Sequence, residues 1–341
     1  MAATYKTQRS ILRYLALPLA VQASPAENMV SADFTHATLM ETGGFAQITS
    51  THESDAKYAG KGSSFTTDSR IIAYDSTMDL STRMDDFLLG YLLAAVLGRD
   101  TFAAGANGAP NTHVLTWLDT SDPAFCINAY VEDTSALQRR FLDMALNELV
   151  LTGSEKGSIM AKASFVGSGR YADGALAAGA RPSVVATPQY IYGSDLTVSI
   201  GPTGAPVSMF PRVWSWEATF TRNVDVVRVP GGGLYAAFLA NGDPSMKLKL
   251  VIGADNSTDI RDWAVNQTEL EVVIAGASGA TTVQLDWPRI KLPISQLTEQ
   301  NKYVAYTVEL GVDNILKPAM GQPFTATIGN TYTQYLQPSA N

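Results

Sequence analysis

Short segments in which hydrophobic and polar residues alternate recur along most of the chain. The clearest of them is WSWEATFT at 214–221. A period of two residues is typical of a β-strand with one buried face, so the chain is predicted to be mainly β. Such segments predict strands at 70–81, 113–118, 125–132, 141–152, 158–166, 189–192, 195–200, 214–222, 224–229, 246–252, 269–275, 281–292, 302–312 and 322–328.

Two segments depart from this period and predict helices. In the segment 85–97 (DDFLLGYLLAAVL), apolar residues recur at helical spacing. Asp85 and Asp86 suit the positive end of the helix dipole, and Gly98 supplies a stop. The remaining face of this helix is hardly polar, so we expect it to be buried on most sides. A shorter acidic helix is predicted at 257–265.

A stretch rich in small residues, 167–182, is the best candidate for a domain boundary. Since a domain has on average about 150 residues, the chain of 341 residues is predicted to hold two domains, 36–166 and 183–330, joined by a linker at 167–182. Each half runs from an alternating strand into a short helix, which suggests a duplication. Residue identity between the halves is too weak to establish a duplication. The alternative is that any mixed β-rich chain offers two such segments.

Both ends of the chain are predicted to lie outside these domains, as an N-terminal arm (1–35) and a polar C-terminal tail (331–341). The basic start and the sequence VQA at 21–23 also fit a secretory signal with a cleavage site. Pro18 interrupts the hydrophobic stretch, which favours the arm. The arm has apolar patches but no core of its own, so we expect it to dock on a neighbouring subunit.

The composition points to a protein whose surface is largely covered by other chains. Charged residues make up only 16% of the sequence, against about 25% in an average soluble protein. Together with 46% hydrophobic residues, this low charge excludes a largely disordered chain. The formal net charge of −8 excludes a polybasic nucleic-acid binder. No apolar run approaches the roughly 20 residues of a membrane helix, so no membrane insertion is expected.

Residues that carry catalysis or bind metals are few and scattered. The single cysteine, Cys126, lies in an apolar run that favours a small buried hydrophobe over a reactive thiol. The three histidines, His36, His52 and His113, are too far apart for metal-ligand spacing. We therefore predict no catalytic residue, no cofactor site and no metal site.

Several short motifs resemble functional signatures without their context. GSGRYA at 167–172 matches a loose dinucleotide fingerprint, but no helix long enough to bind a pyrophosphate follows it. The three glycines at 231–233 predict a flexible turn. Glu269 and Glu271 share one face of a strand, where two carboxylates could serve a glycosidase, although a solvated stripe is the more usual meaning. The sequons at 256–258 and 266–268 matter only in a eukaryotic secretory pathway.

The strand at 70–81, the run MDDFLLGYLLAAVLG at 84–98 and the β-meander after it resemble the tail tube (major tail) proteins of long-tailed bacteriophages. In that family an extended strand leads into an apolar helix of the form Leu-Leu-x-x-x-Leu-Gly. The likeness covers most of 36–330 as a pattern and contains no single diagnostic motif. Later segments that add to it lie at 213–222, 246–252 and 285–293.

This resemblance implies two tail-tube-like domains of β-sandwich or barrel type, each with a short packed helix. Such domains form rings that stack into the tube through which phage DNA leaves. Single-domain members form homohexameric rings, and fused two-domain members form homotrimers with pseudo-sixfold symmetry; the length and the similar halves favour the trimer. The acidic net charge suits such a conduit, because a wall that repels phosphates lets DNA slide.

The resemblance also implies partners and a location. The partners are other copies of the chain, the tape measure, terminator and distal tail proteins, and DNA that passes without specific binding. The location is the tail of the virion, assembled in the host cytoplasm. Two other functions stay open on the sequence alone: a neck, capsid or fibre component of a phage, and a β-rich carbohydrate-active enzyme.

Overall fold

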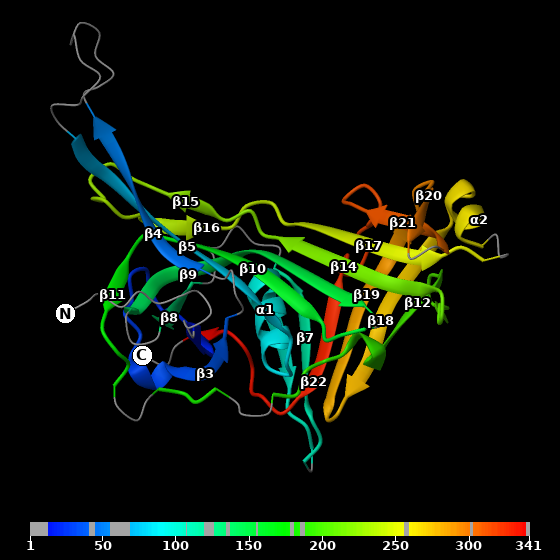
Figure 1. The fold of residues 1–341 in the computed structure, drawn as a ribbon, viewed down its shortest axis with the longest axis horizontal. Coiled ribbons are helices and arrows are strands. Elements are labelled where there is room, and N and C mark those ends of the chain that lie inside the picture. Colours follow the sequence, from blue (N-terminus) through cyan, green and yellow to red (C-terminus); the bar gives the residue numbers. More distant parts are fainter. Residues whose placement is uncertain are drawn as a thin grey trace, which may run out of the picture.

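The computed structural model describes residues 13–40, 45–54, 69–106, 108–118, 126–133, 137–154, 156–177, 181–184, 188–255, 259–300 and 303–338. The predicted fold class is confirmed, because most of these residues form antiparallel strands in two large sheets (Figure 1). The helix α1 (Leu88–Leu97) contacts strands of both sheets and therefore lies between them. One hydrophobic core contains residues of both sheets and of this helix.

The larger sheet has twelve strands and a central path of eight. In spatial order this path is β20 (Gln296–Gln300), β21 (Tyr303–Leu310), β17 (Ser245–Gly253), β14 (Val213–Thr221), β9 (Leu137–Ser154), β10 (Met160–Gly167), β5 (Ser69–Arg83) and β4 (Phe45–Ser54). The first part of β9 extends beyond this path and pairs with β8 (Ile127–Asp133) and β11 (Tyr171–Asp173); β1 (Arg13–Pro18) pairs with β8, and β3 (Phe34–Leu39) pairs with β1. These are the other four strands of the sheet.

The second sheet has seven strands. Their order is β13 (Val207–Ser208), β12 (Leu196–Pro202), β18 (Glu269–Ser278), β19 (Thr281–Lys291), β22 (Thr325–Asn330), β7 (Asn111–Trp117) and β6 (Gly98–Ala103). Two small sheets complete the described strands. They are the pair β15 (Asp225–Val227) and β16 (Phe238–Ala240), and the parallel pair β2 (Ala20–Val21) and β23 (Gln337–Pro338).

The central path consists of two four-stranded units with the same strand order. The first unit is β4-β5-β10-β9 and the second unit is β14-β17-β21-β20. Numbered along the chain, the strands of each unit follow one another in space as first, second, fourth and third. In each unit a helix follows the second strand: α1 in the first unit and α2 (Asp259–Val265) in the second. The units join head to tail, since the third strand of one pairs with the first strand of the other.

Neither large sheet divides at the predicted boundary 167–182. Strand β9, from before this segment, pairs with β14 from after it, and β22 pairs with β7 in the second sheet. The segment itself is no free linker, because Ser168 is buried and β11 pairs with β9. The two halves therefore share their sheets and their core, and the domains 36–166 and 183–330 stay a prediction about repeated units.

The helix α1 is buried as predicted but begins later than the pattern indicates. Its first residue is Leu88, because Asp85 lies in an isolated bridge with Tyr190 before the helix. The Asp85 carboxylate accepts hydrogen bonds from the backbone N–H groups of Phe87 and Leu88, at 3.1 and 2.8 Å. Gly98 ends the helix with φ +86°, a left-handed conformation that favours glycine.

The terminal segments are part of the fold from Arg13 onwards. Strand β1 pairs with β3 and β8, and its residues Tyr14 to Leu17 are buried within their own chain. The expectation that this part of the arm docks on a neighbour is therefore wrong; residues 1–12 lie outside the described residues. Of the predicted tail, Tyr335 is buried against α1, and β23 pairs with β2.

Candidate assembly site

The two outer strands of the eight-stranded path are free on one side. Strand β4 pairs only with β5, and β20 pairs only with β21, among the residues that the structure describes. A free strand edge presents unpaired backbone N–H and C=O groups, which form a template for another strand. The two edges are not alike, because β4 is the first strand of its unit and β20 is the third strand of its unit. Each edge therefore matches the other edge and not itself.

The junction between the two units shows how such edges join. Strands β9 and β14 pair antiparallel from Ser154 opposite Ser215 to Glu148 opposite Thr221. Gly153 lies directly opposite Trp216, and a side chain at Gly153 would collide with the indole ring. The absence of a Cβ thus lets the tryptophan pack flat across the junction, where it is buried.

A buried arginine ties the junction to the core helix. Arg222 follows β14 directly, and only 3% of its surface is exposed. Its guanidinium donates hydrogen bonds to the carbonyl oxygens of Val96 and Leu97, at 3.0 and 2.9 Å, and to Oδ1 of Asn241 at 2.8 Å. Burial lowers the pKa of this guanidinium to about 10. The cation lies at the negative end of α1, where the helix dipole stabilises it.

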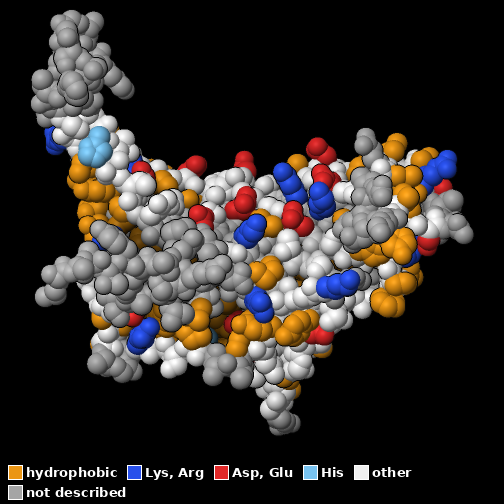
Figure 2. Space-filling model, viewed as in Figure 1, with side chains coloured by type: hydrophobic (Ala, Val, Ile, Leu, Met, Phe, Trp, Pro, Cys, Tyr) orange, Lys and Arg blue, Asp and Glu red, His pale blue; other side chains and the backbone are white. Residues whose placement is uncertain are grey.

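The face of the eight-stranded path that points away from the core is polar and carries charges of both signs (Figure 2). Lys249 of β17 and Glu309 of β21 lie opposite each other and form an ion pair of 2.7 Å. This pairing raises the pKa of Lys249 and lowers that of Glu309. Other charged residues alternate with buried neighbours on these strands: Asp79, Arg83, Glu148, Lys162, Glu217 and Lys247.

The acidic pairs that the sequence singled out are engaged within the chain. Glu269 pairs with Arg289 through two hydrogen bonds of 2.6 and 2.9 Å, and this arginine lowers the pKa of Glu269. Glu271 accepts a hydrogen bond from the backbone N–H of Gly204 at 2.7 Å. A glycosidase needs one carboxylate free to donate a proton and one free to attack. This pair offers neither, and we assign it a structural role.

The cysteine and the histidines do not come together. Burial raises the pKa of the Cys126 thiol to about 12, so the thiol stays protonated. His36 stacks on Phe87 with ring centroids 3.6 Å apart, and burial lowers its pKa to about 4. His113 is buried and lies 2.9 Å from the Asp100 carboxylate, whereas His52 is exposed on β4. The described residues contain no group of three or more His, Cys, Asp or Glu side chains that could hold a metal.

The glycine motifs serve turns and close contacts. In the fingerprint-like segment 167–172, Gly169 has φ +84° and packs against the backbone of Tyr74. The Ser168 hydroxyl donates to the Asp143 carboxylate at 2.6 Å. The glycines at 231–233 lie in the turn between β15 and β16, as predicted. Of the two sequons, 256–258 lies outside the described residues.

The features that carry this site were not predicted from the sequence pattern. Strand β20 lies in a segment without clear alternation, and Arg222 follows an alternating strand as an ordinary polar residue would. A signal for Trp216 was present, because WSWEATFT alternates, but its partner Gly153 gave none. Edge positions depend on which strands pair across the whole chain, and the sequence pattern does not show this.

A large sheet with two free edges is typical of a structural protein that can pair with further strands of other chains. A scan against protein-family models finds the phage tail tube protein family, matched over residues 60–312. The match covers well over half of the chain, and the chain belongs to this family. None of the curated proteins matches the chain.

Family membership confirms the resemblance and the structural role in the tail tube of a phage. It places the protein in the tail of the virion, where tail tube proteins assemble with one another. No helix within the described residues is long and apolar enough to cross a membrane.

Proposed function

We propose that three copies of this chain close a ring in which β20 of one copy pairs with β4 of the next. The observation that carries this proposal is the repeated strand order of the two units. Their junction joins a third strand, β9, to a first strand, β14. The free edges are again a third strand, β20, and a first strand, β4. The contact between copies then repeats the contact within the chain.

The number of chains follows from the number of units. Each chain contributes two units, so three chains supply the six units of a pseudo-sixfold ring. Closing the ring removes every free edge of the inner sheet, which protects the protein from irregular edge-to-edge aggregation. A homohexamer of twelve units is the second candidate for the ring.

In this ring the polar face of the eight-stranded path lines the lumen, and rings stack into the tube that conducts DNA. Charges of both signs occur on this face in similar numbers, and some are paired, as Lys249 is with Glu309. A surplus of carboxylates on this face, which the acidic net charge led us to expect, stays a prediction. A wall without excess cations releases few counterions from DNA, so phosphates are not held tightly.

The remaining properties follow from this role. The protein acts without enzymatic activity, cofactor or metal. It contacts the tape measure, terminator and distal tail proteins at the ends of the tube, and DNA passes through the lumen without specific binding. Assembly takes place in the host cytoplasm, and no step inserts the chain into a membrane.

The ring is tested by placing a charge on the β20 edge. Leu297 is 58% exposed on this strand, on the side that faces the core in neighbouring strands. We expect Leu297→Lys to stay monomeric at concentrations where the wild type forms rings, because lysine on an edge strand opposes pairing. The matched control is Gln284→Lys, on the exposed face of the second sheet.

Size-exclusion chromatography with light scattering gives the number of chains, and axial class averages from electron microscopy give the symmetry. We expect three chains per ring and sixfold-like density with true threefold symmetry. Rings of Leu297→Lys at the wild-type concentration would refute the edge contact. Six chains per ring would establish the homohexamer instead.

A further inference from the structure

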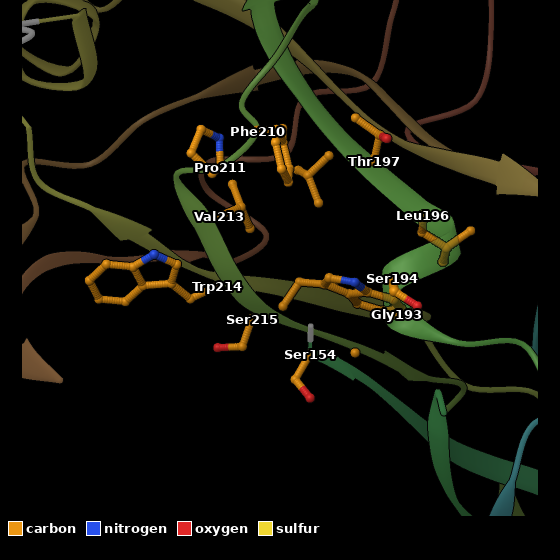
Figure 3. A pocket seen from close by; sticks show the side chains of 13 residues that line it. Ser154, Gly193, Ser194, Leu196, Thr197, Phe210, Pro211, Val213, Trp214 and Ser215 are labelled. Carbon is orange, nitrogen blue, oxygen red and sulfur yellow. The ribbon is translucent and has the colours of Figure 1, made fainter. Parts of the chain in front are cut away.

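A cavity of about 200 Å³ opens at one end of the larger sheet, where β9 ends and β14 begins (Figure 3). Phe210, Trp214 and Trp216 contribute aromatic side chains to its wall, and Ser154 and Thr197 contribute hydroxyl groups. Among the described residues that line it, none has a charged side chain. An uncharged wall gives no counter-charge to a phosphate, a carboxylate or an amine, and so favours a neutral, largely apolar occupant.

The same end of the sheet exposes large apolar side chains around the cavity. Phe210 is 83% exposed, next to the cavity that it lines. Tyr303 and Val304 begin β21, at the same end of the larger sheet as the start of β14, and are 68% and 51% exposed. Tyr303 meets Trp214 edge to face, with ring centroids 6.1 Å apart. An apolar patch with aromatic residues at its centre is characteristic of a protein–protein contact.

The arginine beside this patch is already paired. Arg212 follows the lining residue Pro211, and its guanidinium donates to both carboxylate oxygens of Asp259, at 2.7 and 3.0 Å. Its Nε lies 3.1 Å from the Asp255 carboxylate. Docking of an apolar surface on the patch would therefore leave no isolated charge at this point.

The opposite end of the sheet is different in shape. Strands β4 and β5 run past the body of the protein as a long hairpin, away from the end that holds α2 and β20 (Figure 1). Because strand directions alternate, the cavity lies at the end where β14 starts, and the hairpin leaves at the end where β14 finishes. The two ends of the molecule thus offer two different surfaces along the direction of the strands.

We propose that the cavity and the apolar patch around Phe210 bind a second copy of this chain in the next ring of the tube. This inference rests on the proposed ring, because closure of the ring occupies the β4 and β20 edges and leaves the two ends of the sheet for stacking. The patch docks on the opposite end of the second copy, where the β4–β5 hairpin emerges. Contact between unlike ends gives every ring in the tube the same polarity.

The experiment separates ring formation from stacking. Phe210→Asp places a charge at the centre of the patch, and the exposure of Phe210 means that the fold does not depend on it. We expect this variant to form rings like the wild type but to need at least about tenfold higher concentration to form tubes, as loss of a central aromatic contact typically demands. Phe210→Leu keeps an apolar side chain and should retain most of the stacking. The matched control is Gln284→Asp, which adds the same charge on the second sheet.

Intrinsic fluorescence gives a second readout of the same contact. Of the five tryptophans, Trp117, Trp216 and Trp287 are buried, and the partly exposed Trp214 and Trp263 both lie at the end that holds the patch. We expect quenching by acrylamide to fall when rings stack into tubes. Two results would overturn the proposal: normal tube formation by Phe210→Asp, or equal quenching in rings and tubes. Loss of the rings themselves in Phe210→Asp would assign the patch to the contact within a ring and also overturn it. Failure of Leu297→Lys to disturb rings would instead count against the proposed ring.

Discussion

Arg222 allows a quantitative test of how the two units are held together. The guanidinium is almost fully buried and has three hydrogen-bond acceptors in the structure. A hydrogen bond that involves a charged group contributes about 1.5–3 kcal/mol to stability, so three contribute roughly 5–9 kcal/mol. Against this stands the cost of burying the charge. The fall of the Arg222 pKa from its ordinary value to about 10 corresponds to about 3 kcal/mol.

We therefore expect Arg222→Met to lower the free energy of unfolding by about 2–6 kcal/mol. Methionine fills part of the space but leaves the Val96 carbonyl at the end of α1 without its cation. Arg222→Lys keeps the charge and loses the planar fork, so its loss should be intermediate. Lys247→Met on the exposed face is the control and should change stability by less than about 0.5 kcal/mol.

The assay is urea denaturation of the monomer at pH 7, followed by far-UV circular dichroism and analysed by linear extrapolation. A lower urea midpoint with an unchanged dependence of the unfolding free energy on urea concentration would show a change in stability. The surface exposed on unfolding would then be the same. If the free energy of unfolding of Arg222→Met were within about 0.5 kcal/mol of the wild-type value, the cost of burying the charge would cancel the gain from the hydrogen bonds. The junction would then not depend on this residue.

Two further predictions concern the core helix and its surroundings. Leu92→Asp would place an unpaired carboxylate in the core at a cost of several kcal/mol, so soluble expression should be lost. The control Asp86→Asn should cost about 1 kcal/mol or less. Equal tolerance of both changes would contradict the buried position of α1. The folded-state pKa of His36, about 4, lies below the ordinary 6.5, so the unfolded chain binds more protons between these values. Stability should therefore fall by up to about 3 kcal/mol as the pH drops from 6.5 to 4, and His36→Gln should flatten this dependence in urea denaturation; an unchanged dependence would show that other groups cause it.

Much of the local structure followed from the sequence, because it depends on neighbours along the chain. Alternation placed β5, β14 and β17 within a few residues of their bounds, and the apolar run before Gly98 placed α1. The errors have physical causes. The segment 189–192 forms only isolated bridges, and β1 escaped notice because a strand buried on both faces shows no alternation.

The site itself depends on long-range pairing and was predicted only through the family resemblance. Nothing local distinguishes β4 and β20, which end the sheet, from β9 and β14, which meet inside it. The strand order of the second unit places β21 between β17 and β20, although β20 comes first along the chain. Such an order is decided by how complete faces pack on the core, and periodicity carries no information about it.

The head-to-tail arrangement of two units on one chain has a consequence for how the wall of the tube can evolve. In a ring of six identical chains, each substitution appears six times at once. In the proposed ring, a substitution in the first unit appears in only three of the six units. First and second units, with different side chains, then alternate around the wall. The units differ in their helices, since α1 spans ten residues and α2 seven, yet they have the same strand order. One unit can thus change to meet a new partner while the other preserves the shape that closes the ring.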